Sequence, residues 1–157
     1  MLKQLGGDVL RIEKSIEIRA PPEKVWEMLA LDRMPEYMDV AELKSAKYIS
    51  EVRTPADKYR VGACAHMTEK RWEYDLEITE SLKNEKMTVH TKGGKHGMGY
   101  TATSNLKPVQ EGTKLTMALD IEPGYGILGK ALHRLIRSTE EKIVGRALEK
   151  LKSILEK

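Results

Sequence analysis

The stretch YGILGKALHRLIRSTEEKIVGRALEKLKSILEK, residues 125–157, decides the fold, because its apolar side chains repeat at helical spacing for longer than any other pattern in the chain. Apolar residues three, four or seven positions apart form one stripe along a helix. The stripe comprises Leu128, Leu132, Leu135, Ile136, Ile143, Ala147, Leu151, Ile154 and Leu155. A helix of about thirty residues is roughly 45 Å long, which exceeds the width of a compact domain of this size. We therefore predict a long C-terminal helix around which the rest of the chain wraps.

Length and composition predict a single domain over residues 1–157. Cys64 is the only cysteine in the sequence, so no internal disulfide can form. The N-terminal residues lack the apolar run of a signal peptide, and no window reaches the roughly twenty apolar residues of a membrane span. These features predict a cytoplasmic protein. The balance of 27 Lys and Arg against 24 Asp and Glu is too even to indicate a nucleic-acid partner.

The first elements are a strand and two short helices. Residues 12–20 alternate apolar and polar side chains, which predicts a strand with one solvent-exposed face. The proline pair at 21–22 ends this strand and favours the start of a short helix over residues 22–31. Asp32 is the expected N-cap of a second short helix that runs to Met38.

Six further strands follow from Val40 onwards, because short alternating segments are separated there by turn residues. The segments lie near residues 42–52, 60–70, 72–82, 86–93, 98–107 and 113–121. The connections between the later strands are short, as at Lys83-Asn84-Glu85 and Gln110-Glu111-Gly112, and this favours antiparallel neighbours. The predicted fold class is α+β: a curved, seven-stranded antiparallel sheet around the C-terminal helix, with two short helices between the first and second strands.

The inner face of the predicted sheet carries several small side chains, namely Ala63, Ala65, Ala102 and Ser104. Side chains of this size do not reach a helix about 10 Å from the sheet. Either the sheet closes on them or a cavity remains. In segment 60–70 two phases are possible. Val61, Ala63, Ala65 and Met67 form the favoured inner face, and Gly62, Cys64 and His66 form the alternative.

Two residues interrupt these patterns. Lys14 breaks the apolar face of the first strand, so we expect that end of the strand at a rim of the fold. Gly145 lies in the middle of the long helix, where glycine destabilises by about 1 kcal/mol relative to alanine. We therefore expect a bend or a close backbone contact at Gly145.

Three parts of the chain resemble one known family. They are SIEIRAPPEKVWEMLALDRMPEYM (15–38), RVGACAHMTEKRWEYDLEITE (60–80), and GYGILGKALHRLI with ALEKLKSILE (124–136 and 147–156). They are similar to the opening, the third and fourth strands and the long helix of the START-like, or birch-pollen-allergen-like (SRPBCC), superfamily of polyketide cyclase/dehydrase and lipid transport type. The resemblance runs from about Asp8 to Lys157 and implies a helix-grip fold that holds an apolar or amphipathic molecule between sheet and helix. Tyr37 stands where the family usually has Trp, which leaves the subfamily open.

An inward-facing row on the strands and the long helix is the candidate wall of a ligand-binding site. The row consists of Trp72, Tyr74, Leu76, Met87, Tyr100, Met117, Leu132 and Ile136. Ordinary core packing explains such a row equally well from the residues alone, whereas the resemblance and the small inner residues favour a pocket. Tyr74 and Tyr100 are the candidate polar contacts, because a buried hydroxyl needs a partner and a ligand oxygen can provide one.

No catalytic or metal site is predicted. The carboxylates of the fourth strand alternate onto its solvent-exposed face: Glu73, Asp75 and Glu77. His66 and His90 lack the spacings that zinc sites use, and each is expected to be an ordinary surface or hydrogen-bonded residue. Cys64 has no basic neighbour in the sequence, so we expect a small buried side chain and not a nucleophile.

Two positively charged parts of the chain, a glycine-rich segment and a row on the long helix, each have a structural and a functional interpretation. The glycine-rich segment 92–99 lies between two strands, so it lacks the helix N-terminus of a phosphate loop. We expect a hairpin at the cavity mouth, where Lys95 or His96 could meet an acidic head group. A cationic row on the long helix is expected to be a solvated face, with transient docking on an anionic membrane as the alternative. This row consists of Arg134, Lys142, Arg146 and Lys150.

The sequence thus predicts a carrier or sensor of a lipid, quinone or polyketide-like molecule, without a cofactor and without covalent chemistry. The first alternative is a cyclase or dehydratase in which Tyr74 or His66 moves a proton within the same cavity. The second alternative is a protein-binding module resembling a small chaperone activator, which would still retain its partner protein after Trp72→Ala. The sequence does not identify the ligand or the oligomeric state.

Overall fold

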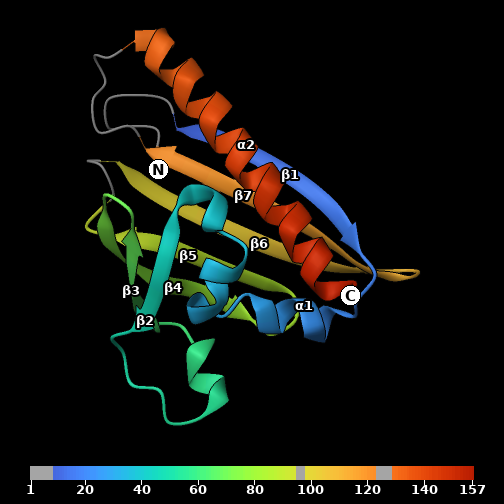
Figure 1. Ribbon diagram of the computed structural model, residues 1–157. Helices are drawn as coiled ribbons and strands as arrows, with labels where there is room; N and C mark the ends of the chain where they lie inside the picture. Colours follow the sequence, from blue (N-terminus) through green and yellow to red (C-terminus); the bar gives the residue numbers. More distant parts are fainter. Residues whose placement is uncertain (1–8, 95–97, 123–128) are drawn as a thin grey trace.

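The computed structural model describes residues 9–94, 98–122 and 129–157, without the side chains of Val40 and residues 129–132. Seven strands form one antiparallel sheet in the order β1-β7-β6-β5-β4-β3-β2, and the long helix α2 lies across one face (Figure 1). The strands are β1 (Leu10–Ile18), β2 (Leu43–Tyr48), β3 (Cys64–Glu69), β4 (Glu73–Leu82), β5 (Lys86–Lys92), β6 (Gly99–Val109) and β7 (Gly112–Glu122). The helices are α1 (Pro22–Met28) and α2 (Gly129–Leu155), with 3-10 helices η2 (Leu31–Glu36), η3 (Asp39–Ala41) and η4 (Pro55–Lys58).

This architecture confirms the predicted α+β helix-grip fold. Strands β1 and β2 occupy opposite edges of the sheet, so the short helices α1, η2 and η3 carry the chain from one edge to the other (Figure 1). Helix α2 approaches the sheet most closely along β1 and not along its middle strands. The space above the middle strands is therefore bounded by α2 on one side and by the short helices on the other.

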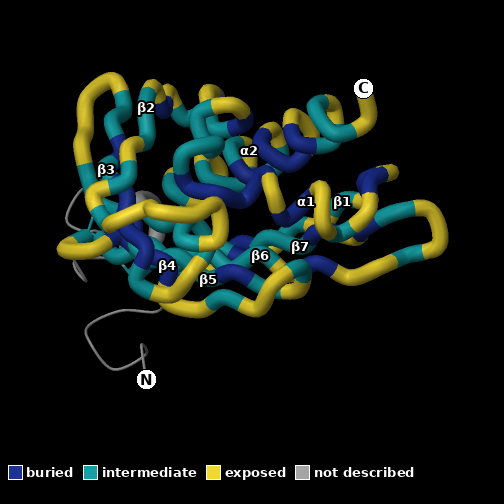
Figure 2. Tube along the Cα trace, turned by 90° about the horizontal axis from the view of Figure 1, so that it is seen from below, coloured by how far each residue is buried: buried dark blue, intermediate teal, exposed yellow. Residues whose placement is uncertain are grey.

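The core lies between α2, α1 and the inner face of the sheet. Ile18, Met67, Ile78, Leu115 and Leu151 are each at most 1% exposed, and burying a side chain of this size stabilises the fold by roughly 1.5–3 kcal/mol. Figure 2 shows the buried segments of the strands and of α2 alternating with exposed ones. This alternation follows from the period of two in the strands and of 3.6 in the helix.

The favoured phase of the third strand is confirmed, since Ala63, Ala65 and Met67 are each 0% exposed. The expectation for Val61 is wrong, because this side chain is 58% exposed. Strand β3 begins only at Cys64, and Gly62 has a φ of 94°, so the alternation does not extend back to Val61. Cys64 is buried and free, as predicted.

The prediction of a long C-terminal helix is confirmed, but Leu135 does not belong to its buried stripe. This side chain is 64% exposed, whereas Ala147 and Leu151 are buried against the sheet side. Leu135 lies seven and eleven positions before Lys142 and Arg146, so it shares the solvated face of the helix with them. The cations predicted to line that face are exposed.

Lys14, which breaks the apolar face of β1, lies close to Gly145 in the middle of α2. Lys14 pairs with Met117 in the β1–β7 ladder, and a Cβ placed on Gly145 would lie 3.3 Å from the Nζ atom of Lys14. The side chain of Lys14 therefore lies between α2 and β1, an edge strand of the sheet, and the expectation of a rim at that end of the strand stays a prediction. Glycine at position 145 leaves room for this side chain, which is the predicted close contact.

Asp32 is not the N-cap predicted for the second short helix. Ala30 occupies that position, and η2 begins at Leu31, whose N–H donates to the Tyr48 hydroxyl at 3.0 Å. The carboxylate of Asp32 instead accepts a hydrogen bond from Lys58 Nζ at 2.7 Å. Tertiary contacts with β2 and η4 thus replace the local cap.

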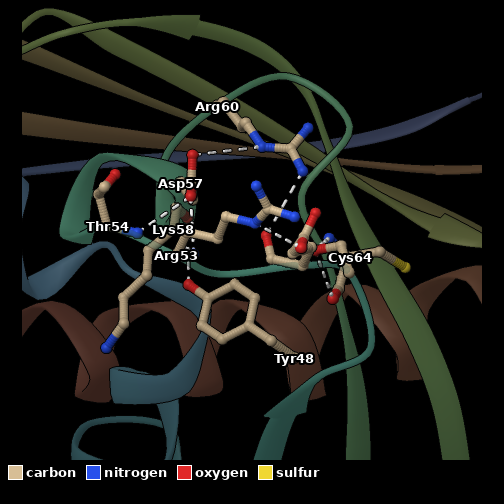
Figure 3. Close-up of polar contacts among 9 residues, drawn as sticks. Tyr48, Arg53, Thr54, Asp57, Lys58, Arg60 and Cys64 are labelled. Atoms are coloured by element: carbon tan, nitrogen blue, oxygen red, sulfur yellow. Dashed lines mark hydrogen bonds and ion pairs between the residues drawn. The ribbon is translucent and has the colours of Figure 1, made fainter.

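The connection between β2 and β3 contains η4, which was not predicted from the sequence. Backbone N–H groups of Arg53 and Thr54 donate to one carboxylate oxygen of Asp57, at 2.8 and 3.0 Å (Figure 3). These two bonds lower the pKa of Asp57. The Tyr48 hydroxyl donates to the carbonyl oxygen of Lys58 at 3.1 Å, which ties the loop to β2. The sequence signal was the spacing Thr54-x-x-Asp57, which is typical of a helix start.

Candidate functional site

A cavity of about 160 Å³ lies between α2, the inner face of β4 to β7 and the short helices. Its wall is mainly apolar, with a few polar side chains from separate elements. The short helices and their flanks contribute Leu29, Leu31, Met34, Tyr37, Met38 and Ala41. The strands contribute Glu69, Tyr74, Leu76, Met87, Val89, Thr91, Tyr100, Ala102, Ser104, Met117, Ala118 and Leu119, and α2 contributes Glu140, Ile143, Val144 and Ala147.

The cavity exists because small side chains face inward where the helix is far from the sheet. Ala102 and Ser104 lie in the middle of β6 and line the cavity. Ala102 pairs with Leu119 and Ser104 with Met117, so the neighbouring positions on β7 also face the cavity. Since α2 runs along β1 at the sheet edge, no side chain of these residues spans the gap. Of the two outcomes that the small inner residues allow, a remaining cavity is the one found at this position.

Most residues of the predicted wall meet at this cavity. Tyr74, Leu76, Met87, Tyr100 and Met117 line it. Ile136 packs on the apolar core but is not part of the cavity wall. The side chain of Leu132 lies outside the described residues. Whether the lining residues bind a ligand stays a prediction.

The inward position predicted for Trp72 is wrong. Its side chain is 49% exposed and does not line the cavity. Strand β4 begins at Glu73, and the backbone N–H of Glu69 donates to the Trp72 carbonyl oxygen at 2.8 Å, closing the β3–β4 hairpin. Trp72 therefore lies in the turn, where strand alternation no longer fixes the direction of a side chain. The alternative of a protein-binding module stays a prediction.

Two carboxylates that were not predicted from the sequence also line the cavity, Glu69 and Glu140. Both lie at positions that the strand alternation of β3 and the apolar stripe of α2 place on the inner side. Glu69 is two positions after the inward Met67 on β3, and Glu140 lies three positions before Ile143 on the buried stripe of α2. Charged side chains usually face solvent, so the pattern alone does not identify these two carboxylates as wall residues.

The polar groups at this part of the wall interact. The Tyr74 hydroxyl donates to a Glu69 carboxylate oxygen at 2.9 Å. Burial, followed by the negative charge of Glu69, raises the pKa of Tyr74. Burial, followed by the charges of Glu140 and Glu69, raises the pKa of Tyr100 to about 12. Both phenols are therefore neutral near pH 7 and serve as hydrogen-bond donors to carboxylates or ligands.

Tyr37 is a third tyrosine in the wall, at the end formed by the short helices. It is 3% exposed, and within the described part of the chain its hydroxyl makes no hydrogen bond. Burial raises the pKa of Tyr37, followed by the negative charge of Glu36. As a residue of the cavity wall, Tyr37 can donate a hydrogen bond to an occupant that supplies an oxygen acceptor.

The sequence profile of one family matches residues 9–156 of this chain, and its description is polyketide cyclase / dehydrase and lipid transport. The chain belongs to this family. Membership of the polyketide cyclase/dehydrase and lipid transport family implies a hydrophobic ligand-binding cavity, which agrees with the mainly apolar wall described above. No curated protein matches the sequence significantly.

Solved structures with the same fold come from several sources. A START superfamily protein from Mycobacterium smegmatis has a TM-score of 0.73 at 12% identity, over 93% of this chain and 97% of the other. The protein TTHA0849 from Thermus thermophilus has a TM-score of 0.68 at 19% identity, over 93% of this chain and 95% of the other. The di-domain ARO/CYC protein StfQ of the steffimycin biosynthetic pathway has a TM-score of 0.73 at 15% identity, over 94% of this chain and 51% of StfQ. At such low sequence identities, the structural similarity establishes a common fold and no more.

Within the described residues, no helix of this family member is long and apolar enough to cross a membrane. The described residues also contain no group of three or more His, Cys, Asp or Glu side chains placed to hold a metal ion. The cytoplasmic location and the possible contact with a membrane surface stay predictions. The basic residues Lys95 and His96 of the predicted mouth hairpin lie outside the described residues.

The outer face of the sheet carries His66, which is therefore not a candidate for proton transfer in the cavity. Its ring nitrogens lie 2.8 Å from carboxylate oxygens of Asp75 and Glu73. Asp75 is the direct partner of His66 in the β3–β4 ladder, which explains one contact. These hydrogen bonds, first to Glu73 and then to Asp75, raise the pKa of His66.

Stability is expected to depend on pH through His66. Because its folded-state pKa lies above the ordinary value of 6.5, the contribution is fully present below pH 6.5 and is lost as pH rises through the raised pKa. The ring is exposed, so the effect is less than about 1 kcal/mol. An NMR titration measures the pKa of the His66 ring, and urea unfolding across this pH window measures the change in stability.

The double variant Glu73→Gln, Asp75→Asn should return the pKa of the His66 ring towards 6.5. An unchanged ring pKa would contradict this assignment.

Proposed function

We propose that this protein binds a small apolar or amphipathic molecule in the cavity between α2 and the sheet, without covalent chemistry. The observation that carries the proposal is the cavity itself. It combines a mainly apolar wall with the buried Tyr37, whose hydroxyl makes no hydrogen bond within the described part of the chain. Apolar area removed from water contributes about 25 cal/mol per Å² to binding, and one or two polar contacts fix orientation.

The size of the cavity limits the ligand. A cavity near 150 Å³ accepts a molecule of about the size of benzene, and the volume here is about 160 Å³. A single ring or a short branched chain fits without rearrangement. A larger lipid, quinone or polyketide requires the wall to widen. Four methionines line the cavity, Met34, Met38, Met87 and Met117, and their flexible side chains can repack around variable contents.

Native mass spectrometry of the protein purified from its own host is the first test, because a carrier should retain an apolar mass. The second test uses toluene as a defined apolar probe and follows the methionine methyl resonances by NMR. Toluene should shift the resonances of Met87 and Met117, which line the cavity, more than that of Met67, which is buried elsewhere. A protein that carries no apolar mass and does not bind toluene would refute the proposal.

Filling the cavity should weaken ligand binding strongly. Ala102→Leu places a larger side chain in the cavity wall, and we expect toluene affinity to fall at least roughly tenfold, because the site no longer has room for the ring. Thr103→Leu is the matched control, since the next residue on β6 faces the opposite side and contacts Thr88 there. Equal loss of binding in both variants would indicate unfolding and not a filled cavity. Circular dichroism distinguishes these results.

An enzymatic function of cyclase or dehydratase type is the second candidate. The hydrogen-bonded pair Glu69 and Tyr74 and the carboxylate of Glu140 favour it, because they are titratable groups inside the cavity. Such groups can move protons if a reactive substrate lies within hydrogen-bond reach. Turnover of an aromatic polyketide that is abolished by Tyr74→Phe would support this function. Turnover that is unchanged in Tyr74→Phe would exclude Tyr74 from the chemistry.

A further inference from the structure

A groove beside α1 lies apart from the apolar cavity. We propose that it is a second binding site, which takes a small zwitterionic molecule of the free amino acid class, with an ammonium group, a carboxylate and an apolar side chain. The groove has a volume of about 550 Å³, within the range of small-molecule sites. No described residue lines both the groove and the cavity, so this inference does not rest on the proposed function.

Three separate parts of the chain form the walls of the groove. They are α1, with Glu23, Trp26 and Glu27; residues 55–60, with Pro55, Ala56, Tyr59 and Arg60; and the end of β4 with the turn to β5, with Ser81, Lys83 and Asn84. Positions i, i+3 and i+4 share one face of a helix, so α1 presents its three residues to the groove together.

An aromatic pair joins the first two walls. The rings of Trp26 and Tyr59 stack with their centroids 5.7 Å apart, and the Tyr59 hydroxyl donates to the carbonyl oxygen of Glu27 at 3.0 Å. These contacts hold residues 55–60 against α1 although the two segments are far apart in the chain. The pair, together with Pro55 and Ala56, gives the groove an apolar surface that a ligand side chain can contact.

The charges on the walls differ in sign. The α1 wall is acidic through Glu23 and Glu27, whereas the other two walls carry Arg60 and Lys83. Among the described residues, no ion pair joins either carboxylate of α1 to either of these cations. Because the opposite charges share one groove without direct contact, a molecule that carries both signs can pair with both walls at once.

Both cations have donors available for a ligand carboxylate. Lys83 makes no hydrogen bond or ion pair with a described residue. The Nε atom of Arg60 lies 3.8 Å from a carboxylate oxygen of Asp57 (Figure 3), and its Nη2 atom donates to the carbonyl oxygen of Glu51 at 3.4 Å. Both contacts are long, and a guanidinium group has five N–H donors, so Arg60 can bind a carboxylate without losing them.

The acidic wall has acceptors available for a ligand ammonium group. Glu23 has no partner among the described residues, and Glu27 lies 3.7 Å from Lys24 in an exposed pair. Asn84 adds an acceptor in the same groove, because its side-chain oxygen is buried and receives no hydrogen bond in the described part of the chain. The terminal torsion of an asparagine side chain is broad, so this oxygen can turn towards a ligand N–H.

An NMR titration with L-phenylalanine locates the site. The chain has two tryptophans, and of these Trp26 lines the groove, whereas Trp72 lies just before β4. We expect L-phenylalanine at millimolar concentration to shift the indole resonance of Trp26 and to leave that of Trp72 unchanged. Affinities are taken from the shift of Trp26, so that binding in the apolar cavity does not contribute.

Two analogues with a single charge test the charge assignment: 2-phenylethylamine lacks the carboxylate, and 3-phenylpropanoate lacks the ammonium group. We expect L-phenylalanine to bind at least roughly threefold tighter than either, since each exposed ion pair contributes modestly. The double variant Arg60→Gln, Lys83→Gln should bind L-phenylalanine and the propanoate more weakly and the amine unchanged. The double variant Glu23→Gln, Glu27→Gln should bind L-phenylalanine and the amine more weakly and the propanoate unchanged.

Two further variants complete the test. Lys107→Gln is the matched control, since it removes the same charge from an exposed position of β6 outside the groove, and it should bind all three probes as the unmodified protein does. Asn84→Gly removes the amide oxygen. Asn84 has a φ of 65°, which glycine adopts readily, so the turn should persist while the affinity for L-phenylalanine falls roughly twofold or more.

Several results would overturn the inference. If L-phenylalanine does not shift the Trp26 resonance, or shifts that of Trp72 more, the groove is not the site. Equal affinity for the three probes, or unchanged binding of L-phenylalanine in both double variants, contradicts the zwitterion assignment. The same weakening in Lys107→Gln would assign the effect to net charge. None of these results decides whether toluene binds in the apolar cavity, which the resonances of Met87 and Met117 report separately.

Discussion

Replacing Leu151 with alanine is expected to lower the free energy of unfolding by about 2–5 kcal/mol, the range of Leu→Ala changes in well-packed cores. Leu151 is 0% exposed and lies in the last turns of α2, where the helix packs on the core. The change removes buried apolar area and leaves a void that the surrounding strands can close only partly. Urea unfolding followed by circular dichroism measures the loss as a lower transition midpoint.

Leu135→Ala is the control, because it makes the same chemical change in the same helix. Leu135 is 64% exposed, so we expect a change within about 0.5 kcal/mol. Alanine also has the higher helix propensity, which offsets part of any loss. If both variants lose the same stability, α2 does not pack through the face that the structure assigns to it.

Replacing Gly112 with alanine is expected to destabilise the fold by about 3 kcal/mol or more, at the upper end of overpacking effects. Gly112 opens β7 and pairs with Val109 across the β6–β7 hairpin. A Cβ at this position would overlap the carbonyl oxygen of Ile18 and lie 3.0 Å from the Cα atom of Arg19. Both are backbone atoms at the end of β1, so neither can move without disturbing the sheet. Thermal and urea unfolding measure the effect.

The neighbouring structure makes this clash difficult to relieve. The Thr113 hydroxyl, which is 0% exposed, donates to the Ala20 carbonyl oxygen at 2.7 Å and holds the same two segments together. Gly99→Ala is the matched control at the other end of the β6–β7 pair, where the nearest atom to a new Cβ would be 3.7 Å away. We expect little change there. A stable Gly112→Ala protein would mean that β1 and the β6–β7 hairpin approach each other less closely than described.

The cavity could be predicted in part because it depends on strand alternation. Tyr74, Leu76, Met87 and Tyr100 line it because each lies inside a regular strand, where the direction of a side chain follows from its position. The prediction for Trp72 failed because a strand boundary lies at Glu73, and boundaries are the least reliable part of a sequence pattern. Glu69 and Glu140 are in phase with inward positions, but charged side chains are rarely buried, so the pattern alone does not point to them.

The sequence by itself determined the element types, the antiparallel order implied by short hairpins, and the presence of small residues on the inner face. These follow from periodicity and turn chemistry, which are local. Only the tertiary structure decided where α2 crosses the sheet, that Gly145 leaves room for Lys14, and that two carboxylates and Tyr37 share one cavity. The physical reason is that those relations join residues far apart in the chain, and their distances depend on packing that no local pattern encodes.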